Sequence, residues 1–337
     1  MTFLRSLFLL LPLALLCACG PDKGTARIEG HISGVNQATI MAYVGDATSA
    51  DAGGMDTIRV ERGKFSYDRT LSEPVVLTLL YPNFSSTTIV AEPGKTVSLS
   101  GDANRLKEIE LKGTKDNELL TELRLRLAEK SPNDAEMEVA TFIRSHPKTM
   151  AAVAAFIDQF DGREQFKREP ALSLLNLLHK SQPTNAYLGH LRQRILPLLQ
   201  TSIGSQLPAF TATTLDGTTI THESLKGKPA LIVFSATWDG QNYVLRQAMS
   251  RVRRSLGDKV NTMVLSLDPT KADVERQVER DSLKNVVHAK DAFTTPIVKT
   301  FGVRSVPGNI LTDARGRIVA TNIPADKFVD ELSKHTK

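Results

Sequence analysis

The spacing of apolar residues changes twice along the chain, and each change marks a different kind of structure. Over residues 26–100 apolar and polar residues alternate, as they do around Ile28 and Ile32. Such alternation is typical of strands with one buried face, and the segment 92–95, Glu-Pro-Gly-Lys, supplies a β-turn between two of them. The pattern predicts about six or seven short strands in an antiparallel sheet or small sandwich.

Helical spacing replaces the alternation from about residue 116 to residue 200. Leu119, Leu123 and Leu127 recur at every fourth position, which places them on one face of a helix. The segment 131–134, Ser-Pro-Asn-Asp, combines an N-cap, a proline at the first helical position and an acidic residue in the first turn. Further helices are predicted over 149–160, 170–180 and 185–196.

Strands and helices alternate from residue 204 to the end of the chain. Strands are predicted over 230–234, 260–267 and 285–289, with a hairpin formed by 309–311 and 317–320. Helices are predicted over 241–256, 271–280 and 324–335. This order implies an α/β domain with a mixed sheet.

A single long apolar run, residues 8–16, stands near the start and follows Arg5. Nine residues are too few to span a bilayer as a helix and match the core of a secretory signal peptide. The segment 16–19, Leu-Cys-Ala-Cys, resembles a bacterial lipobox, which implies cleavage before Cys19 and acylation of that cysteine. We therefore expect a lipid-anchored, periplasm-facing protein, in the outer membrane because Gly20 is not the aspartate linked to inner-membrane retention. An ordinary signal peptide cut elsewhere is the alternative.

The cysteine count limits the chemistry that remains. The chain has two cysteines, Cys17 and Cys19. If the first is removed with the signal peptide and the second is acylated, the mature protein contains no thiol.

Charge and motif spacing exclude other classes of function. The 42 basic and 37 acidic residues give a mixed surface that does not indicate nucleic-acid binding. The seven histidines lack zinc-site spacing, and no glycine-rich phosphate loop follows a predicted strand. We therefore expect no metal and no cofactor. The segment 266–268, Ser-Leu-Asp, is interpreted as strand-end polarity rather than a hydrolase motif.

Two stretches of the C-terminal region resemble the TlpA/ResA-like branch of the thioredoxin superfamily. They are "LPAFTATTLDGTTITHESLKGKPALIVFSATWDGQN" at 207–242 and "FGVRSVPGNILTDARGRIV" at 301–319. The N-terminal half resembles an uncharacterised β domain that precedes such thioredoxin domains in lipoproteins of Gram-negative bacteria. The segments that carry this second resemblance are "GKFSY", "VAEPGKTVSLSGD" and "LKGTKDNELLTEL".

In this family the motif Trp-Cys-x-x-Cys carries the chemistry at a strand-to-helix turn. The first cysteine attacks a substrate disulfide as a thiolate, and the second resolves the mixed disulfide. The matching segment here is 238–242, Trp-Asp-Gly-Gln-Asn, so Asp239 and Asn242 stand at the cysteine positions. The resemblance therefore implies the fold of an oxidoreductase without its catalytic residues.

Asp239 has two interpretations. An aspartate at a helix start accepts backbone N–H bonds and suits the positive end of the helix dipole, so helix capping is the main one. The alternative is a functional carboxylate. Asn242 is expected to be a polar residue of the first helical turn.

A groove for a peptide is the remaining candidate site. Pro307 aligns with the cis-proline of the family, and the residue before it offers backbone groups to an extended peptide there. The resemblance thus implies a binding groove outlined by Trp238, Gly240, Val306 and Pro307. The alternative is that Pro307 is only a structural turn residue.

The sequence as a whole predicts a multidomain α+β protein. It has an N-terminal antiparallel β sandwich or sheet, a middle α-helical region and a C-terminal thioredoxin-like α/β domain with a mixed sheet. The predicted segments are a signal peptide (1–18), a lipidated tether (19–25), a β domain (26–112), a helical domain (113–203) and a thioredoxin-like domain (204–337).

The favoured function is non-catalytic binding or scaffolding, with an envelope protein or peptide as partner. One alternative is a contribution to envelope thiol-disulfide homeostasis through a partner. Another is non-redox enzyme chemistry with Asp239 as acid or base.

Overall fold

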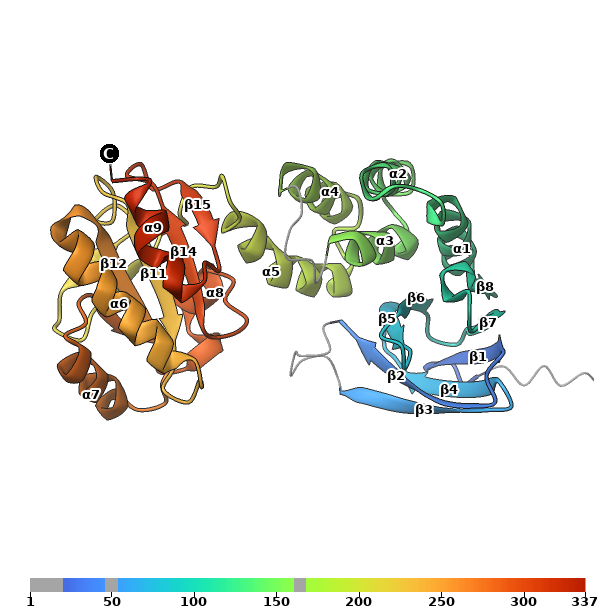
Figure 1. Cartoon of the computed structure of the whole chain (residues 1–337). Helices are drawn as coiled ribbons and strands as arrows, with labels where there is room; N and C mark the ends of the chain where they lie inside the picture. The colour runs from blue at the N-terminus through green and yellow to red at the C-terminus, as the bar shows by residue number, and fades with distance from the viewer. Residues whose placement is uncertain (1–20, 46–53, 161–167, 337) are drawn as a thin grey trace, which may run out of the picture. The chain divides into compact units, whose positions relative to one another are not determined.

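The computed structural model describes residues 21–45, 54–160 and 168–336, and the chain divides into two compact units, 1–159 and 160–337 (Figure 1). The predicted signal peptide and Cys19 lie outside the described residues. Within the described ranges no helix is both long and apolar enough to cross a membrane. The domain boundaries drawn from the sequence stay predictions.

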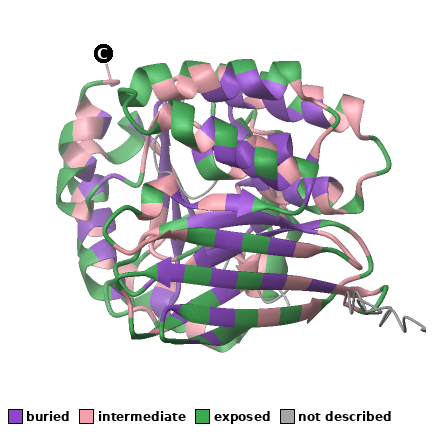
Figure 2. Ribbon diagram, turned by 90° about the vertical axis from the view of Figure 1, so that its right-hand side faces the viewer, coloured by how far each residue is buried: buried purple, intermediate pink, exposed green. Residues whose placement is uncertain are grey.

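The first unit contains an eight-stranded sheet in the order β6-β5-β2-β3-β4-β1-β7-β8. Its strands are β1 (Thr25–Ser33), β2 (Gln37–Val44), β3 (Met55–Glu61), β4 (Lys64–Thr70), β5 (Val75–Leu80), β6 (Ser86–Ala91), β7 (Thr96–Asp102) and β8 (Glu110–Lys112). Buried and exposed residues alternate along several of these strands, as the sequence predicts (Figure 2).

The sheet differs from the prediction of an antiparallel one at a single pair of neighbours. β1 and β7 pair in parallel, with Ile28 opposite Val97, whereas the other neighbouring strands are antiparallel. Alternation shows which residues face the core but carries no information on strand direction. The fold class therefore needs this correction.

Helix α1 (Lys115–Leu127) binds both outermost strands of the sheet through polar side chains. Asn117 is fully buried; its Oδ1 accepts the Val90 N–H of β6 at 3.0 Å and its Nδ2 donates to the Val90 carbonyl at 2.8 Å. Thr121 Oγ1 accepts the Leu111 N–H of β8 at 2.8 Å and donates to the Leu111 carbonyl at 3.1 Å. Side chains of α1 thus occupy backbone N–H and carbonyl groups of β6 and β8 that could otherwise pair with another strand.

The buried face of α1 includes one of the three regularly spaced leucines, Leu123. Asn117, Leu120, Thr121 and Leu123 are buried, while Leu119 and Leu127 are only partly covered. Two of the buried positions are polar, so a search for apolar periodicity identifies the face only in part.

The other helical predictions agree with the structure. α2 (Pro132–Ser145) begins after Ser131, whose hydroxyl accepts the Asp134 N–H at 3.3 Å. The remaining helices of the middle region are α3 (Met150–Phe160), α4 (Arg168–Ser181) and α5 (Ala186–Gln200).

The second unit contains a five-stranded mixed sheet in the order β13-β12-β11-β14-β15. β11 is parallel to β12 and antiparallel to β14. The strands are β11 (Ala230–Ser235), β12 (Asn261–Ser266), β13 (Val286–His288), β14 (Gly308–Thr312) and β15 (Ile318–Thr321), beside a separate hairpin of β9 (Thr211–Thr213) and β10 (Thr219–Thr221). The helices are α6 (Asn242–Leu256), α7 (Lys271–Asp281), α8 (Pro296–Thr300) and α9 (Phe328–Ser333). The predicted mixed α/β arrangement is confirmed.

Both faces of this sheet are buried, because β11 sends successive side chains into opposite cores. Ile232 and Phe234 join a core that includes Val298 of α8. Val233 joins a second core with residues of α6 and α9. The continuous apolar run of β11 follows from this double burial.

Replacing Asn117 tests the role of α1. Asn117→Leu should lower the free energy of unfolding by about 2–3 kcal/mol, because the Val90 backbone groups lose buried partners. Urea unfolding measures this change, and faster hydrogen exchange of the Val90 amide localises it. Asn133→Leu, at an exposed position of α2, is the control and should change stability by less than about 0.5 kcal/mol. Equal effects of the two variants would contradict the assignment.

Candidate functional site

The turn from β11 into α6 carries the residues that the sequence singled out. Trp238 lies in this turn, and more than half of its side chain is exposed. Tyr243 and Val244 at the start of α6 are equally open to solvent, whereas Asn242, the first residue of the helix, is buried. Three large apolar side chains in or just after the turn are therefore exposed.

Asp239 stabilises the turn ahead of the helix rather than the helix itself. Its Oδ1 accepts the Gln241 N–H at 3.3 Å, and its carbonyl accepts the Asn242 N–H at 3.1 Å. The N-cap of α6 is Gln241, which makes no side-chain capping bond. The predicted helix-capping role of Asp239 is therefore corrected, because one further turn separates this residue from the first helical position.

The two residues at the cysteine positions both present oxygen acceptors. Asp239 Oδ2 and Asn242 Oδ1 are buried and have no hydrogen-bond partner among the described residues. Gly240 is exposed, and a Cβ added there would meet nothing within 4 Å. Space alone therefore does not require a glycine in this turn.

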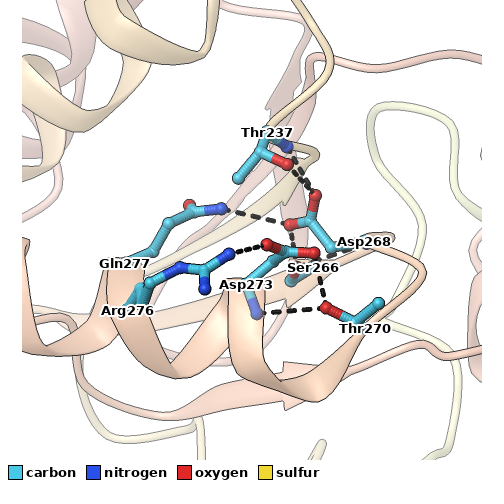
Figure 3. Close-up of polar contacts among 7 residues, drawn as sticks. All are labelled: Thr237, Ser266, Asp268, Thr270, Asp273, Arg276 and Gln277. Atoms are coloured by element: carbon cyan, nitrogen blue, oxygen red, sulfur yellow. Dashed lines mark hydrogen bonds and ion pairs between the residues drawn. The ribbon is translucent and has the colours of Figure 1, made fainter.

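A fully buried carboxylate, Asp268, supports the turn from the neighbouring strand (Figure 3). Its Oδ1 accepts the N–H of Thr237 at 2.7 Å and the hydroxyl of Thr237 at 2.5 Å. Its Oδ2 accepts the Ser266 hydroxyl at 2.6 Å and the Gln277 amide at 3.1 Å. These four hydrogen bonds end on one carboxylate, so the backbone directly before Trp238 is fixed to β12 and α7.

The first turn of α7 is organised around the same cluster (Figure 3). Thr270 Oγ1 accepts the Asp273 N–H at 3.2 Å and donates to the Asp273 carboxylate at 2.5 Å. Arg276 forms an ion pair with Asp273. This capping holds the helix that supplies Gln277 to Asp268.

Sequence reasoning missed Asp268 as a site residue. The segment 266–268 was interpreted as strand-end polarity, but the register places Ser266 opposite Ser235, so Asp268 follows β12 where Thr237 follows β11. The carboxyl ends of neighbouring parallel strands lie at one edge of a sheet. The signal that identifies Asp268 is the Ser-x-Asp segment at the end of β12, because β12 is the parallel neighbour of β11.

The Val306–Pro307 peptide bond is cis and lies next to the end of β11. Phe234 is opposite Gly308 in the β11–β14 ladder, so the two residues before Gly308 come beside the last residue of β11. No hydrogen bond to the Val306 N–H or carbonyl is found among the described residues. The structure thus brings the predicted residues Val306 and Pro307 to the turn that carries Trp238.

Comparison with known proteins adds the following similarities. Residues 26–120 match the family described as a domain of unknown function, DUF4369. Over 136 residues the chain is 27% identical to the thiol-disulfide oxidoreductase ResA of Bacillus thuringiensis subsp. konkukian. The aligned region covers 40% of this chain and 77% of ResA. The ResA of Bacillus cereus matches with the same values. The similarity to ResA supports the resemblance to thioredoxin-like thiol-disulfide oxidoreductases at family level.

Two solved structures similar to part of this chain are described as thiol-disulfide oxidoreductases. The thioredoxin domain of a thiol-disulfide oxidoreductase from Bacteroides vulgatus is 22% identical, covers 40% of this chain and 99% of its own, and has a TM-score of 0.37. A thiol-disulfide oxidoreductase from Bacteroides fragilis is 21% identical, covers 39% and 98%, and has a TM-score of 0.35.

Removing the charge of Asp268 tests its role under the turn. Asp268→Asn should lower the free energy of unfolding by about 2–3 kcal/mol, because an amide cannot accept all four hydrogen bonds. Trp238 is the single tryptophan of the sequence, so its fluorescence and its quenching by acrylamide report the same change at the turn. Asp258→Asn, at an exposed position of the same unit, is the control. Unchanged quenching in Asp268→Asn would contradict a positioning role.

Proposed function

We propose that the C-terminal unit is a non-catalytic binding module built on a thioredoxin-like site. The observation that carries this proposal is the pair Asp239 and Asn242 at the positions of the two family cysteines. A carboxylate cannot form a mixed disulfide, and an amide cannot resolve one. The surrounding turn, cis-proline loop and buried Asp268 are nevertheless present.

An extended peptide is the ligand that this surface suits best. The Val306 N–H and carbonyl, for which no partner is found among the described residues, offer one donor and one acceptor to a peptide strand, which is the basis of β-augmentation. Trp238 and Tyr243 provide exposed aromatic area next to the turn, and such residues contribute much of the binding energy at interfaces. The peptide would thus be held by contacts and released without a covalent step.

The location of the protein is also proposed. The lipobox-like segment 16–19 supports acylation of Cys19 and a periplasm-facing position, with the outer membrane favoured. A lipid-anchored binding module would act on other proteins or peptides of the cell envelope.

A second candidate function is a contribution to envelope thiol-disulfide homeostasis. The similarity to ResA favours it. Since the site holds no cysteine, the thiol would come from a bound partner, and this protein would position that partner or its substrate.

Restoring the motif tests whether the site lacks only its thiols. The purified protein should reduce insulin no faster than buffer. The double variant Asp239→Cys/Asn242→Cys should gain a measurable rate with dithiothreitol as reductant, because the turn and the helix start that activate a thiol are in place.

The single variant Asp239→Cys is the matched control for this gain. Its thiolate should attack oxidised glutathione, form a mixed disulfide and release one glutathione thiol, but the variant should reduce insulin no faster than buffer, because no second thiol resolves the intermediate. Insulin reduction by the unaltered protein would contradict the proposal, as would a double variant that stays inactive.

Photo-cross-linking locates the binding surface. A photoreactive benzoylphenylalanine at position 243 should capture a defined partner in cells. The same residue at position 315, in the turn between β14 and β15 at the other end of the strand, should capture none. Equal capture at both positions would contradict a specific site at the turn.

A further inference from the structure

One half of β2 in the first unit lacks a strand on one side. β2 pairs with β3 from Gln37 to Tyr43, but it pairs with β5 only from Met41 to Val44. β5 ends at Leu80, and the chain then turns away toward β6 (Figure 1). Residues 37–40 therefore have a strand neighbour on the β3 side alone.

The open side of this segment carries unused backbone groups. In an antiparallel sheet alternate residues turn their N–H and carbonyl toward the same neighbour. No hydrogen bond from residues 37–40 to a group outside the β2–β3 pair is found among the described residues. An edge of this kind is a template for another strand.

An apolar cavity of about 400 Å³ adjoins the open edge. Its lining includes Ala38 and Ile40 of β2, residues 81–83 of the following turn, and the apolar residues Val35 and Leu106. The lining also includes Asn36, Gln37 and Asn83 but no charged residue. A cavity of this size and composition accepts uncharged apolar side chains.

The turn beside the cavity holds an exposed aromatic residue in a costly conformation. Phe84 has a φ of +62° and its side chain is 86% exposed. That region of φ favours glycine, because a Cβ crowds the backbone there. Strained residues are typical of ligand-contacting segments, and the fold itself makes little use of the Phe84 ring.

We propose that residues 37–40 of β2 bind an extended, uncharged segment of a partner protein as an added strand, with an apolar side chain of that segment in the cavity. Main-chain pairing at an open edge provides affinity, and a pocket for alternate side chains provides specificity. A lipid chain would fill the cavity but leave the strand edge unpaired, so the observations favour a peptide.

The full chain is tested with a fluorescein-labelled nonapeptide of alternating threonine and valine residues, by fluorescence anisotropy. Ala38→Lys should weaken binding about tenfold or more, because it places a charge in the apolar cavity. Thr39→Lys adds the same charge to the exposed face of the same strand and should leave binding within about twofold. Phe84→Gly should raise the urea midpoint of unfolding and weaken binding.

A second probe keeps the test independent of how the variants fold. In this probe, alternate backbone amides of the same peptide are N-methylated, so the peptide keeps its side chains but loses the N–H donors along one edge. The unaltered protein should bind it about tenfold more weakly. The proposal is overturned if both peptides bind equally, or if neither binds at about 1 mM. Binding to phosphatidylethanolamine–phosphatidylglycerol vesicles that depends on Phe84 but not on Ala38 would also overturn it, in favour of a membrane contact.

Discussion

Backbone N–H and carbonyl groups of β-strands need hydrogen-bond partners, and both units of this protein depend on how this need is met. Buried N–H and carbonyl groups without partners cost free energy comparable to a lost hydrogen bond, so a sheet edge must be paired, covered or exposed. In the first unit α1 covers both outer strands through Asn117 and Thr121. Among the described residues, 37–40 of β2 in the first unit lack a strand on one side, and the Val306 backbone in the second unit has no hydrogen-bond partner. We propose that both places accept an extended chain.

In the proposed function, the second unit keeps a supported turn of the thioredoxin-like kind but has no cysteine in it. Asp268 fixes the turn before Trp238 through Thr237, although no thiol follows that turn. A buried carboxylate with four donors specifies one backbone geometry. The same rigidity serves a binding surface, since a preformed turn limits the entropy lost when a peptide binds.

The sequence predicted the elements better than it predicted how they meet. The alternation around Ile28 and the helix start at Ser131 depend on local patterns, and both appear in the structure. The parallel pairing of β1 with β7 depends on a contact across about 70 residues, which no local pattern records. The leucine spacing did not identify Asn117 and Thr121 as buried, because both are polar and their partners are backbone groups of distant strands.

The candidate site was likewise predicted only in part from the sequence. Trp238, Asp239, Asn242 and Pro307 lie in two segments that resemble a known family, and the β11–β14 register brings those segments together. Asp268 was overlooked because its role arises from the neighbouring strand.

The most direct test of the account is hydrogen exchange at Val306 while the partner captured at position 243 is bound, with a reductant present throughout. Binding through backbone pairing predicts slower exchange of the Val306 amide and a shifted Trp238 indole signal, both insensitive to the reductant. Unchanged exchange at Val306, or binding lost on reduction of the partner, would contradict it.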